Sequence, residues 1–266
     1  MRRSQSIKVL IPHGLRVVLR TLYNHVWLSR NYNSFPYGLW WSLWNRVYKT
    51  EGMTFELPLQ MMPIGFRSRF LFDAYENGER TLTKKYLDTK DVIIELGGCL
   101  GIVSCIINRL LSEPTRHVVV EANPELIPWI AKNRMINNGK FNIEQGLLSR
   151  SSNGDFHIHK LIVSGSADLK GGRLVKVPVF SIEQVCEKYS FSPTVLVMDI
   201  EGGEISFLDE NFEWLNQQLT VKKLIVEIHP FIVGQHAIVR FHDQLKELGF
   251  VKKDKIGSVE AWIRES

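Results

Sequence analysis

Apolar and polar positions divide the chain into short buried strands and amphipathic helices that alternate. Between the strands, residues 102–111 and 124–137 carry apolar side chains at helical spacing, and the second stretch ends at the helix-stop signal Asn-Asn-Gly. The strands themselves are runs rich in Val, Ile and Leu, which is typical of strands buried in a sheet: residues 92–94, 118–120, 195–198 and 224–226. The alternation predicts an α/β fold built from βαβ units.

The last third of the chain shows two further patterns. Residues 150–182 alternate in strand fashion around a Ser- and Gly-rich loop, which predicts a β insertion that forms part of a substrate wall. A helix is expected over residues 241–248. The apolar residues at 249–251 and 261–263 then predict a paired antiparallel hairpin.

The first third of the chain differs in kind from the rest. Residues 7–28 form an amphipathic pattern, and an aromatic cluster with near-helical spacing follows. Residues 51–90 are predicted to be a connecting region, except for a helix over residues 78–87 that leads into the first strand. We therefore expect a helical N-terminal extension over residues 1–77 and a catalytic domain over residues 78–266. The aromatic cluster comprises Tyr37, Trp40, Trp41, Trp44 and Tyr48.

Charge separates the same two regions. The chain of 266 residues has a formal net charge of +5, but residues 1–50 hold eight Lys or Arg and no acid, leaving 25 basic and 28 acidic residues elsewhere. A basic, Trp-rich segment of this kind either lies on an anionic membrane surface or packs on the domain or on a second subunit. No nucleic-acid-binding motif accompanies the charge, so we expect no nucleic-acid partner.

Cysteine usage and hydropathy indicate the cellular compartment in which the protein is expected. Three cysteines are too few and wrongly spaced for a disulfide framework or a zinc site, which favours a reducing compartment. No run approaches the length of a transmembrane helix, and no signal-peptide pattern is present. The expected localisation is cytoplasmic, with peripheral contact to the inner face of a membrane if the N-terminal segment binds lipid.

A glycine-rich turn follows the first predicted strand. Residues 91–109 read DVIIELGGCLGIVSCIINR, in which Glu95 ends the strand and Gly97, Gly98 and Gly101 lead into a helix. Glycine allows a sharp turn and close approach of a ligand to the backbone. The turn lacks the G-x-G-x-x-G spacing, so a pyrophosphate-binding dinucleotide site is disfavoured.

A second acid sharpens this hypothesis. Glu121 ends the next strand, 26 residues after Glu95, and an acid at that position accepts the ribose hydroxyls of an adenosine ligand. S-adenosylmethionine has no phosphates and needs only close backbone approach and such an acid. The alternative is that Glu121 merely ends a strand.

Two later strands also end in polar residues. Asp199, Glu201 and Glu204 lie within six residues around two glycines, and the following strand ends in Glu227-Ile-His229-Pro230. Ligands bind at this edge of open parallel sheets, so a site is expected there. Glu79, near the start of a predicted helix, either faces the mouth of the cofactor site or is a solvated residue that complements the helix dipole.

These motifs together resemble the FkbM-like family of S-adenosylmethionine-dependent methyltransferases over residues 78–263. MDIEGGE (198–204) is similar to the family's K-I-D-V-E-G-A-E, ELGGCLG to its D-I-G-A-N-x-G, and VVEANPE to its F-E-P-N-P, with differences at Glu95, Cys99 and Ala122. The resemblance implies a Rossmann-like fold, with a seven-stranded, mostly parallel sheet whose last strand is antiparallel. It also implies O-methylation, often of a sugar hydroxyl in a glycan or glycosylated natural product. The candidate cofactor-binding residues are Glu79, Glu95, Gly97, Gly98, Gly101, Glu121, Ala122, Asn123 and Asp199.

The candidate catalytic residues are His229, Asp199, Glu201 and Glu204. His229 is the first candidate for a base that takes the proton of the acceptor hydroxyl, because imidazole titrates near neutral pH. Asp199 either serves as base, orients His229 or contacts the cofactor, and Glu201 and Glu204 are expected to align sugar hydroxyls. Alternatively, Asp199 with Glu201 or Glu204 holds a magnesium ion that acidifies the hydroxyl, and the sequence leaves base and metal undecided.

Two other functions remain open. A nicotinamide-dependent oxidoreductase would share the acids at strand ends but needs a phosphate-binding glycine pattern. A non-catalytic, membrane-associated binding protein on a methyltransferase scaffold would be expected to have lost the acidic motifs, yet all of them are present.

Overall fold

The computed structural model describes residues 33–45, 47–158, 165–166 and 172–265. Their contacts divide the chain into two units. The smaller unit comprises the described residues of 33–45 and 63–75, and the larger comprises residues 47–62 and the described residues from 76 onward. Within this described part of the chain, no helix is long and apolar enough to cross a membrane.

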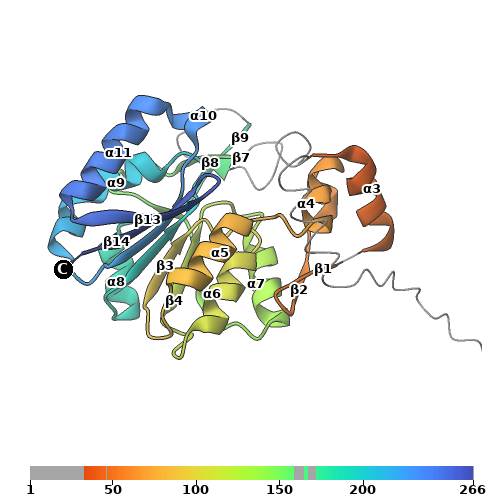
Figure 1. Ribbon diagram of the computed structural model, residues 1–266, viewed down its shortest axis with the longest axis horizontal. Helices are drawn as coiled ribbons and strands as arrows, with labels where there is room; N and C mark the ends of the chain where they lie inside the picture. The colour runs from red at the N-terminus through yellow and green to blue at the C-terminus, as the bar shows by residue number, and fades with distance from the viewer. Residues whose placement is uncertain (1–32, 46, 159–164, 167–171, 266) are drawn as a thin grey trace, which may run out of the picture. The chain divides into compact units, whose positions relative to one another are not determined.

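The larger unit is built around a seven-stranded sheet with the order β13-β14-β12-β11-β3-β4-β5 (Figure 1). Neighbouring strands from β12 to β5 are parallel, whereas β14 runs antiparallel to both β12 and β13. The predicted seven-stranded, mostly parallel sheet with an antiparallel last strand is confirmed. The strands are β3 (Ile93–Leu96), β4 (His117–Glu121), β5 (Asn142–Gln145), β11 (Val195–Met198), β12 (Lys223–Glu227), β13 (Phe250–Ile256) and β14 (Val259–Arg264).

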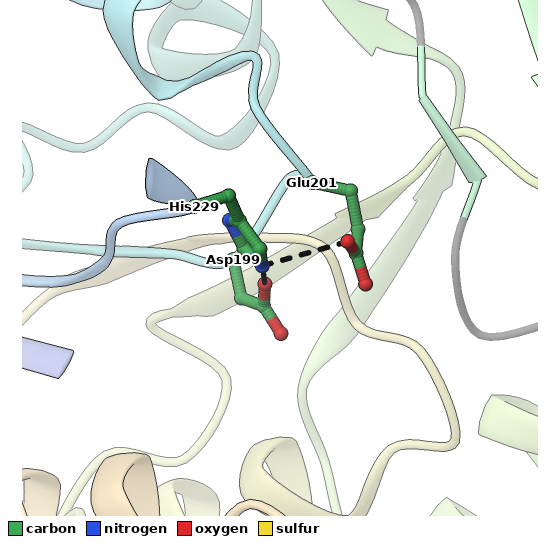
Figure 2. A group of neighbouring side chains, drawn as sticks. All are labelled: Asp199, Glu201 and His229. Carbon is green, nitrogen blue, oxygen red and sulfur yellow. Dashed lines mark ion pairs between the residues drawn. The ribbon is translucent and has the colours of Figure 1, made fainter. Parts of the chain in front are cut away.

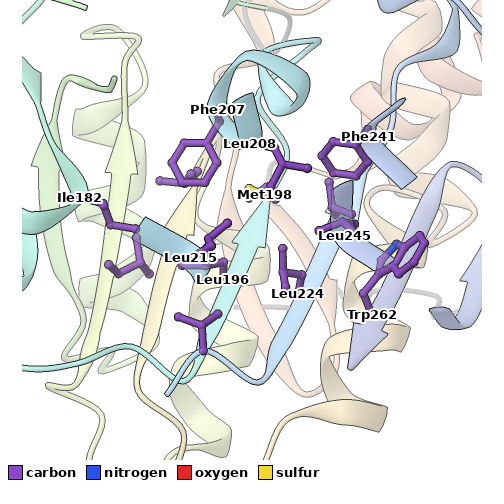
Figure 3. Close-up of a cluster of buried hydrophobic side chains, with 14 of the residues drawn as sticks. Ile182, Leu196, Met198, Phe207, Leu208, Leu215, Leu224, Phe241, Leu245 and Trp262 are labelled. Carbon is purple, nitrogen blue, oxygen red and sulfur yellow. The ribbon is translucent and has the colours of Figure 1, made fainter. Parts of the chain in front are cut away.

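Helices cover both faces of this sheet, as the continuous apolar character of its central strands requires. Alternate strand residues point to opposite faces. Leu196 and Met198 of β11 join the core beneath α8, α9 and α11 (Figure 3), whereas Val197 packs with α5 and α6 on the other face. The helices are α5 (Asn77–Tyr86), α6 (Ile102–Leu110), α7 (Ile127–Ile136), α8 (Ile182–Tyr189), α9 (Glu204–Gln217), α10 (Pro230–Val233) and α11 (Gln235–Glu247).

The predicted helix over residues 78–87 corresponds to α5, and that over 124–137 to α7. The predicted terminal hairpin is confirmed, since Phe250 pairs with Arg264 and Val251 with Ile263. The predicted β insertion comprises β7 (Asp155–Ile158), β8 (Gly165–Ser166) and β9 (Arg173–Lys176) in one small sheet, and β10 (Val179–Phe180) paired with β6 (Leu147–Leu148).

The prediction of a simple connecting region after residue 50 is wrong. β1 (Val47–Thr50) and β2 (Met53–Glu56) form a hairpin, followed by the short 3₁₀ helix η1 (Leu59–Met61). The hairpin belongs to the larger unit because two side chains of α7 bind its backbone. Asn137 Oδ1 accepts from the Thr54 N–H at 3.1 Å, and Asn133 Oδ1 accepts from the Glu56 N–H at 2.8 Å. The residues that make these contacts are distant from each other in the sequence, so the local hydrophobic pattern could not predict the hairpin.

The smaller unit contains α3 (Phe35–Trp44), the short 3₁₀ helix η2 (Gly65–Arg67) and α4 (Ser68–Leu71). The helix predicted from the aromatic cluster is therefore present at residues 35–44, but Tyr48 lies in β1 of the larger unit. The compact units also differ from the predicted boundary between residues 77 and 78, because residues 47–62 belong with the larger unit. The amphipathic stretch over residues 7–28 lies outside the described residues.

Gly97 is a position where only glycine fits. Its φ is +88°, and a Cβ there would lie 1.8 Å from the carbonyl oxygen of Asp199. We expect Gly97→Ala to lower the free energy of unfolding by about 3 kcal/mol or more, because backbone strain and overpacking add. Urea denaturation measures the change.

Gly257→Ala is the matched control. Gly257 also has a positive φ, +63°, but no atom lies within 4 Å of its Cβ position. This variant should lose only about 1 kcal/mol, which is the cost of the left-handed backbone alone. Equal losses in the two variants would contradict the steric explanation.

Candidate active site

The register of the central strands brings three chain segments to one edge of the sheet. Leu96 of β3 pairs with both Val120 of β4 and Met198 of β11, so these strands end almost level. Gly97 and Asp199 come directly after β3 and β11, and Glu121 is the last residue of β4. The polar groups that the sequence places at strand ends are therefore neighbours in space.

The turn after β3 has the tight geometry expected of its glycines. The backbone is left-handed at Gly97, at Cys99 and at Gly101, which is the residue before α6. Gly98 lies against Val119, since a Cβ there would approach its Cγ1 to 2.4 Å. Gly98 and Gly101 thus pack the turn onto the sheet and α7, whereas Gly97 leaves room for the neighbouring Asp199 backbone.

Glu121 is held at the end of β4 by the backbone. Its two carboxylate oxygens accept from the N–H groups of Cys99 at 2.8 Å and Asn123 at 2.7 Å. Burial raises the pKa of Glu121 to about 7 despite these two hydrogen bonds. The prediction that it merely ends a strand therefore does not account for its position, because the carboxyl group also borders a cavity.

That cavity has a volume of about 300 Å³ and extends from the turn after β3 to α9. Its apolar wall includes Leu96, Val120, Leu147 and Phe156. Among the described residues that line it there is no Lys or Arg, so the charged side chains of its lining are acidic. The acidic residues in the lining are Glu121, Asp155, Asp199, Glu201 and Glu210.

His229 lies beside two of these acids. Its Nε2 is 3.6 Å from Asp199 Oδ1 and 3.5 Å from Glu201 Oε2, and Figure 2 shows the imidazole edge facing both carboxylates. His229 does not itself line the cavity, but its side chain remains 16% exposed. The three residues offer ligand atoms within 4.8 Å of one another, so they also form a group that could hold a metal ion.

Glu204 fixes the orientation of this imidazole. Its side chain is buried at the start of α9 and accepts from the N–H groups of Ile200 and Gly202. Its Oε1 also lies 3.2 Å from His229 Nδ1. A carboxylate only accepts hydrogen bonds, so Nδ1 carries the proton and Nε2 faces Asp199 and Glu201. Glu204 therefore positions His229, and the expectation that it aligns sugar hydroxyls is wrong because it is fully buried.

The surrounding acids control the charge of His229. Burial by itself would lower its pKa, but the hydrogen bond to Glu204 and the charges of Glu204, Glu201 and Glu227 raise the pKa to about 9. At this pKa the imidazole is protonated at neutral pH.

A second group of carboxyls lies beside the first. Glu79, Asp199 and Glu227 offer oxygen atoms within 4.8 Å of one another. Burial and the neighbouring Glu227 raise the pKa of Glu79 well above its usual value, and burial followed by Glu227 does the same for Asp199. Glu79 is thus a buried member of this group, and the alternative that it is a solvated helix residue is wrong.

Glu95 occupies a different position from the one predicted. Its buried side chain accepts from Ser104 Oγ at 2.7 Å and lies 2.9 Å from His117 Nε2. It joins α6 to the sheet and does not line the main cavity. Glu79, Glu95 and Gly98 instead line a small cavity that shares Leu96, Gly97 and Asp199 with the main one.

Of the other predicted cofactor-binding residues, Gly97, Ala122, Asn123 and Asp199 line the main cavity with Glu121. The β insertion predicted to form a wall also contributes Ser151, Asn153, Asp155 and Phe156 to the lining. The remaining walls were not predicted from the sequence. Residues 146–149 follow β5, and residues 203, 206, 207 and 210 belong to the start of α9. The sequence analysis placed Glu227 at the end of a strand but did not include it among the candidate site residues. Its position at the strand end was the signal that could have identified it as a member of the site.

Comparison with known families gives one match, to the family described as "Methyltransferase FkbM domain", over residues 97–252. The match spans more than half of the chain and includes Gly97, Glu121, Asp199 and His229. No curated protein matches the chain.

Similar folds occur among solved structures. A precorrin-6y C5,15-methyltransferase from Geobacter metallireducens is 13% identical, with a TM-score of 0.43 over 69% of this chain and 87% of that one. TYW2 of M. jannaschii in complex with AdoMet is 14% identical, with a TM-score of 0.43 over 82% of both chains. A ribosomal protein L11 methylase from Lactobacillus delbrueckii subsp. bulgaricus is 13% identical, with a TM-score of 0.41 over 71% of this chain and 77% of that one. Likeness at this level carries no information on the acceptor.

Replacing Glu204 tests whether its carboxylate orients His229 and raises the pKa of the imidazole. We expect Glu204→Gln to lower the pKa of His229 from about 9 by about one unit or more, because the amide keeps the shape but removes a neighbouring negative charge. Proton–carbon NMR of the imidazole as a function of pH measures the shift. Glu213→Gln, an exposed residue of the same helix, should leave this pKa unchanged. An unchanged pKa in Glu204→Gln would remove the positioning role.

Proposed function

The chain belongs to the FkbM methyltransferase family, and we propose that it is an S-adenosylmethionine-dependent O-methyltransferase that acts on a sugar hydroxyl of a glycan or glycosylated metabolite. One observation carries the choice of cofactor. Five carboxyl groups and no Lys or Arg line the described part of the main cavity. Such a cavity attracts a ligand with positive charge and repels one with phosphates.

This charge pattern separates the proposed cofactor from its main rival. S-adenosylmethionine carries a cationic sulfonium and an ammonium group, and it supplies a methyl group that is open to attack by a nucleophile. A nicotinamide dinucleotide carries a pyrophosphate, for which dinucleotide sites provide helix N–H groups in a phosphate-binding turn. The acidic lining therefore supports the methyl donor and opposes the dinucleotide.

The two ends of the donor would meet different residues. Glu121 would accept the ribose hydroxyls, with Ala122 and Asn123 beside it. Gly97, Glu79 and Asp199 would surround the ammonium end. Glu79 and Asp199 are crowded there beside Glu227, and the raised pKa values of Glu79 and Asp199 reflect a need for a counter-charge. The orphaned Oδ1 of Asp199 has no hydrogen-bond partner in the structure and is suited to such a contact.

His229 would remove the proton from the acceptor hydroxyl. Glu204 holds Nδ1, which leaves Nε2 to accept that proton beside Asp199 and Glu201. The pKa of His229 would fall toward neutrality when positive charge enters the cavity, because a nearby like charge disfavours the imidazolium. Binding of the donor would thus prepare the base.

A magnesium ion is the second candidate for activating the hydroxyl. Asp199, Glu201 and His229 form a mixed oxygen and nitrogen group of suitable size. Such an ion would lower the pKa of the hydroxyl and replace the need for a base.

A sugar acceptor suits the mouth of this site. Glu201, Asn153 and Asp155 offer acceptors and donors to hydroxyl groups. Phe231 follows His229 by two residues on α10 and is fully exposed, which leaves an aromatic face for the apolar side of a sugar ring. A non-catalytic scaffold would have no need to keep His229 oriented by a buried carboxylate.

The cofactor assignment is tested by titration calorimetry with S-adenosylhomocysteine. Wild type should bind with micromolar affinity, and Glu121→Ala should bind at least tenfold more weakly, a change of about 1.4 kcal/mol or more. Glu125→Ala, an acid four residues away that pairs with Arg173, should bind as wild type does. Thermal unfolding confirms that each variant is folded. Absence of binding by folded wild type would leave the non-catalytic scaffold as the function.

The base is tested by methyl transfer to a panel of glycans. We expect His229→Ala to lower kcat by about 10²–10⁴-fold while binding of S-adenosylhomocysteine is retained. For wild type, kcat/KM for the methyl donor reports the enzyme before the donor binds, and it should rise with pH up to about 9 because only the neutral imidazole accepts a proton. His236→Ala, an exposed histidine on α11, is the control.

Chelation distinguishes the two means of activation. Activity that survives strong chelation removes the metal candidate, whereas full activity in His229→Ala removes the base.

A further inference from the structure

The main cavity continues beyond the residues that would hold the ammonium group and the ribose of the donor. This further end, here called the α9 end, is formed by the segment after β5 and by the first turns of α9. Glu210 is the one charged side chain of this group, and it is half-buried. The α9 end is lined by Leu147, Leu148, Ser149, Ser206, Phe207 and Glu210.

The order of the strands indicates which part of the donor reaches the α9 end. Along the ligand edge the strands follow one another in the order β11, β3, β4 and β5. Asp199 and Gly97, where the ammonium end would lie, therefore come first, Glu121 comes next, and the segment after β5 comes last. In S-adenosylmethionine the ribose joins the sulfonium to the adenine ring. With the ribose at Glu121, the adenine ring would extend to the α9 end.

The chemistry of the α9 end suits a flat base. Leu147, Leu148 and Phe207 offer apolar surface to the faces of a ring, so the polar edge of the ring must be recognised by other groups. Glu210 lies six residues after Glu204, about 9 Å further along α9. It is therefore well separated from the carboxylate that positions His229.

The carboxylate of Glu210 is fixed by one of its two oxygens. Oε2 accepts from Ser149 Oγ and from the Arg150 N–H, both at 2.8 Å. These hydrogen bonds join α9 to the segment after β5, which forms the opposite wall. Among the described residues none donates a hydrogen bond to Oε1, so Oε1 is the acceptor that Glu210 has left for a ligand in the cavity it borders.

A fixed acceptor distinguishes between purines. Adenine carries an amino group at position 6, which donates hydrogen bonds, whereas hypoxanthine carries a carbonyl oxygen there, which accepts them. A carboxylate only accepts. A site built to accept from the amino group would thus reject the carbonyl, because two acceptors would face each other without a proton between them.

We propose that Glu210 is a specificity-determining residue for the donor, with Oε1 accepting a hydrogen bond from the 6-amino group of adenine. The proposal rests on the proposed function, since it requires an adenosine-based donor with its ribose at Glu121.

Titration calorimetry of the full chain with two ligands tests the proposal. The ligands are S-adenosylhomocysteine and S-inosylhomocysteine, which differ only in the amino or carbonyl group at position 6. Wild type should bind the adenosyl ligand about tenfold or more tightly than the inosyl ligand.

Glu210→Gln should reverse this preference. The Arg150 N–H can only donate, so the amide oxygen of the glutamine must take the place of Oε2 and the amide nitrogen the place of Oε1. A donor then faces the base, and the variant should bind the inosyl ligand more tightly than the adenosyl ligand. Glu213→Gln, on an exposed residue of the same helix, should keep the wild-type ratio of affinities.

The ratio of two affinities measured on one sample does not depend on the fraction of protein that is folded, and thermal unfolding reports that fraction. Equal binding of the two ligands by wild type would overturn the role of Glu210 and leave the proposed function standing, and so would an unchanged ratio in Glu210→Gln. Absence of S-adenosylhomocysteine binding by folded wild type would overturn both.

Discussion

Mutual repulsion between carboxyl groups is the constraint on which the organisation of the site depends. The parallel register of β11 and β12 brings Asp199 and Glu227 to one edge of the sheet, and the turn after β11 adds Glu201. In low-dielectric surroundings such a group is unfavourable unless protons or cations compensate it. Against the effect of burial, the neighbouring carboxylates raise the pKa of His229 to about 9, so the imidazole supplies one positive charge at neutral pH. The remaining negative potential is an affinity for cations built into the fold.

The elements that could be predicted from the sequence are those whose pattern is local. The Val- and Ile-rich run of β3 predicts a buried strand, and the apolar spacing of α6 predicts a helix. The terminal hairpin is predicted by two short apolar runs. Glu121 and Asp199 were also identifiable, because an acid at the end of a parallel strand lies at the ligand edge whatever the details of the fold.

The elements that could not be predicted depend on contacts between distant residues. Glu204 and His229 are 25 residues apart, and only the pairing of β11 with β12 shows that one orients the other. Glu79 is buried and lies beside Glu227, and a helix pattern in the sequence contains no sign of this neighbour. Tyr48 has helical spacing with the preceding tryptophans, yet strand pairing with Phe55 outweighs that spacing.

The antiparallel strand β14 has a consequence for how the protein is made. The turn before β14 binds the end of β12, since Ser258 Oγ donates to Glu227 and the Ser258 carbonyl accepts from the Ile228 N–H at 3.0 Å. During synthesis, β3, β4 and β11 leave the ribosome well before this turn. The acidic edge of the sheet therefore spends part of its time on the ribosome without the partner that holds Glu227. A nascent chain that has not yet reached β14 lacks the turn that holds Glu227, so the acidic edge of the sheet is completed only when the last strand has been made.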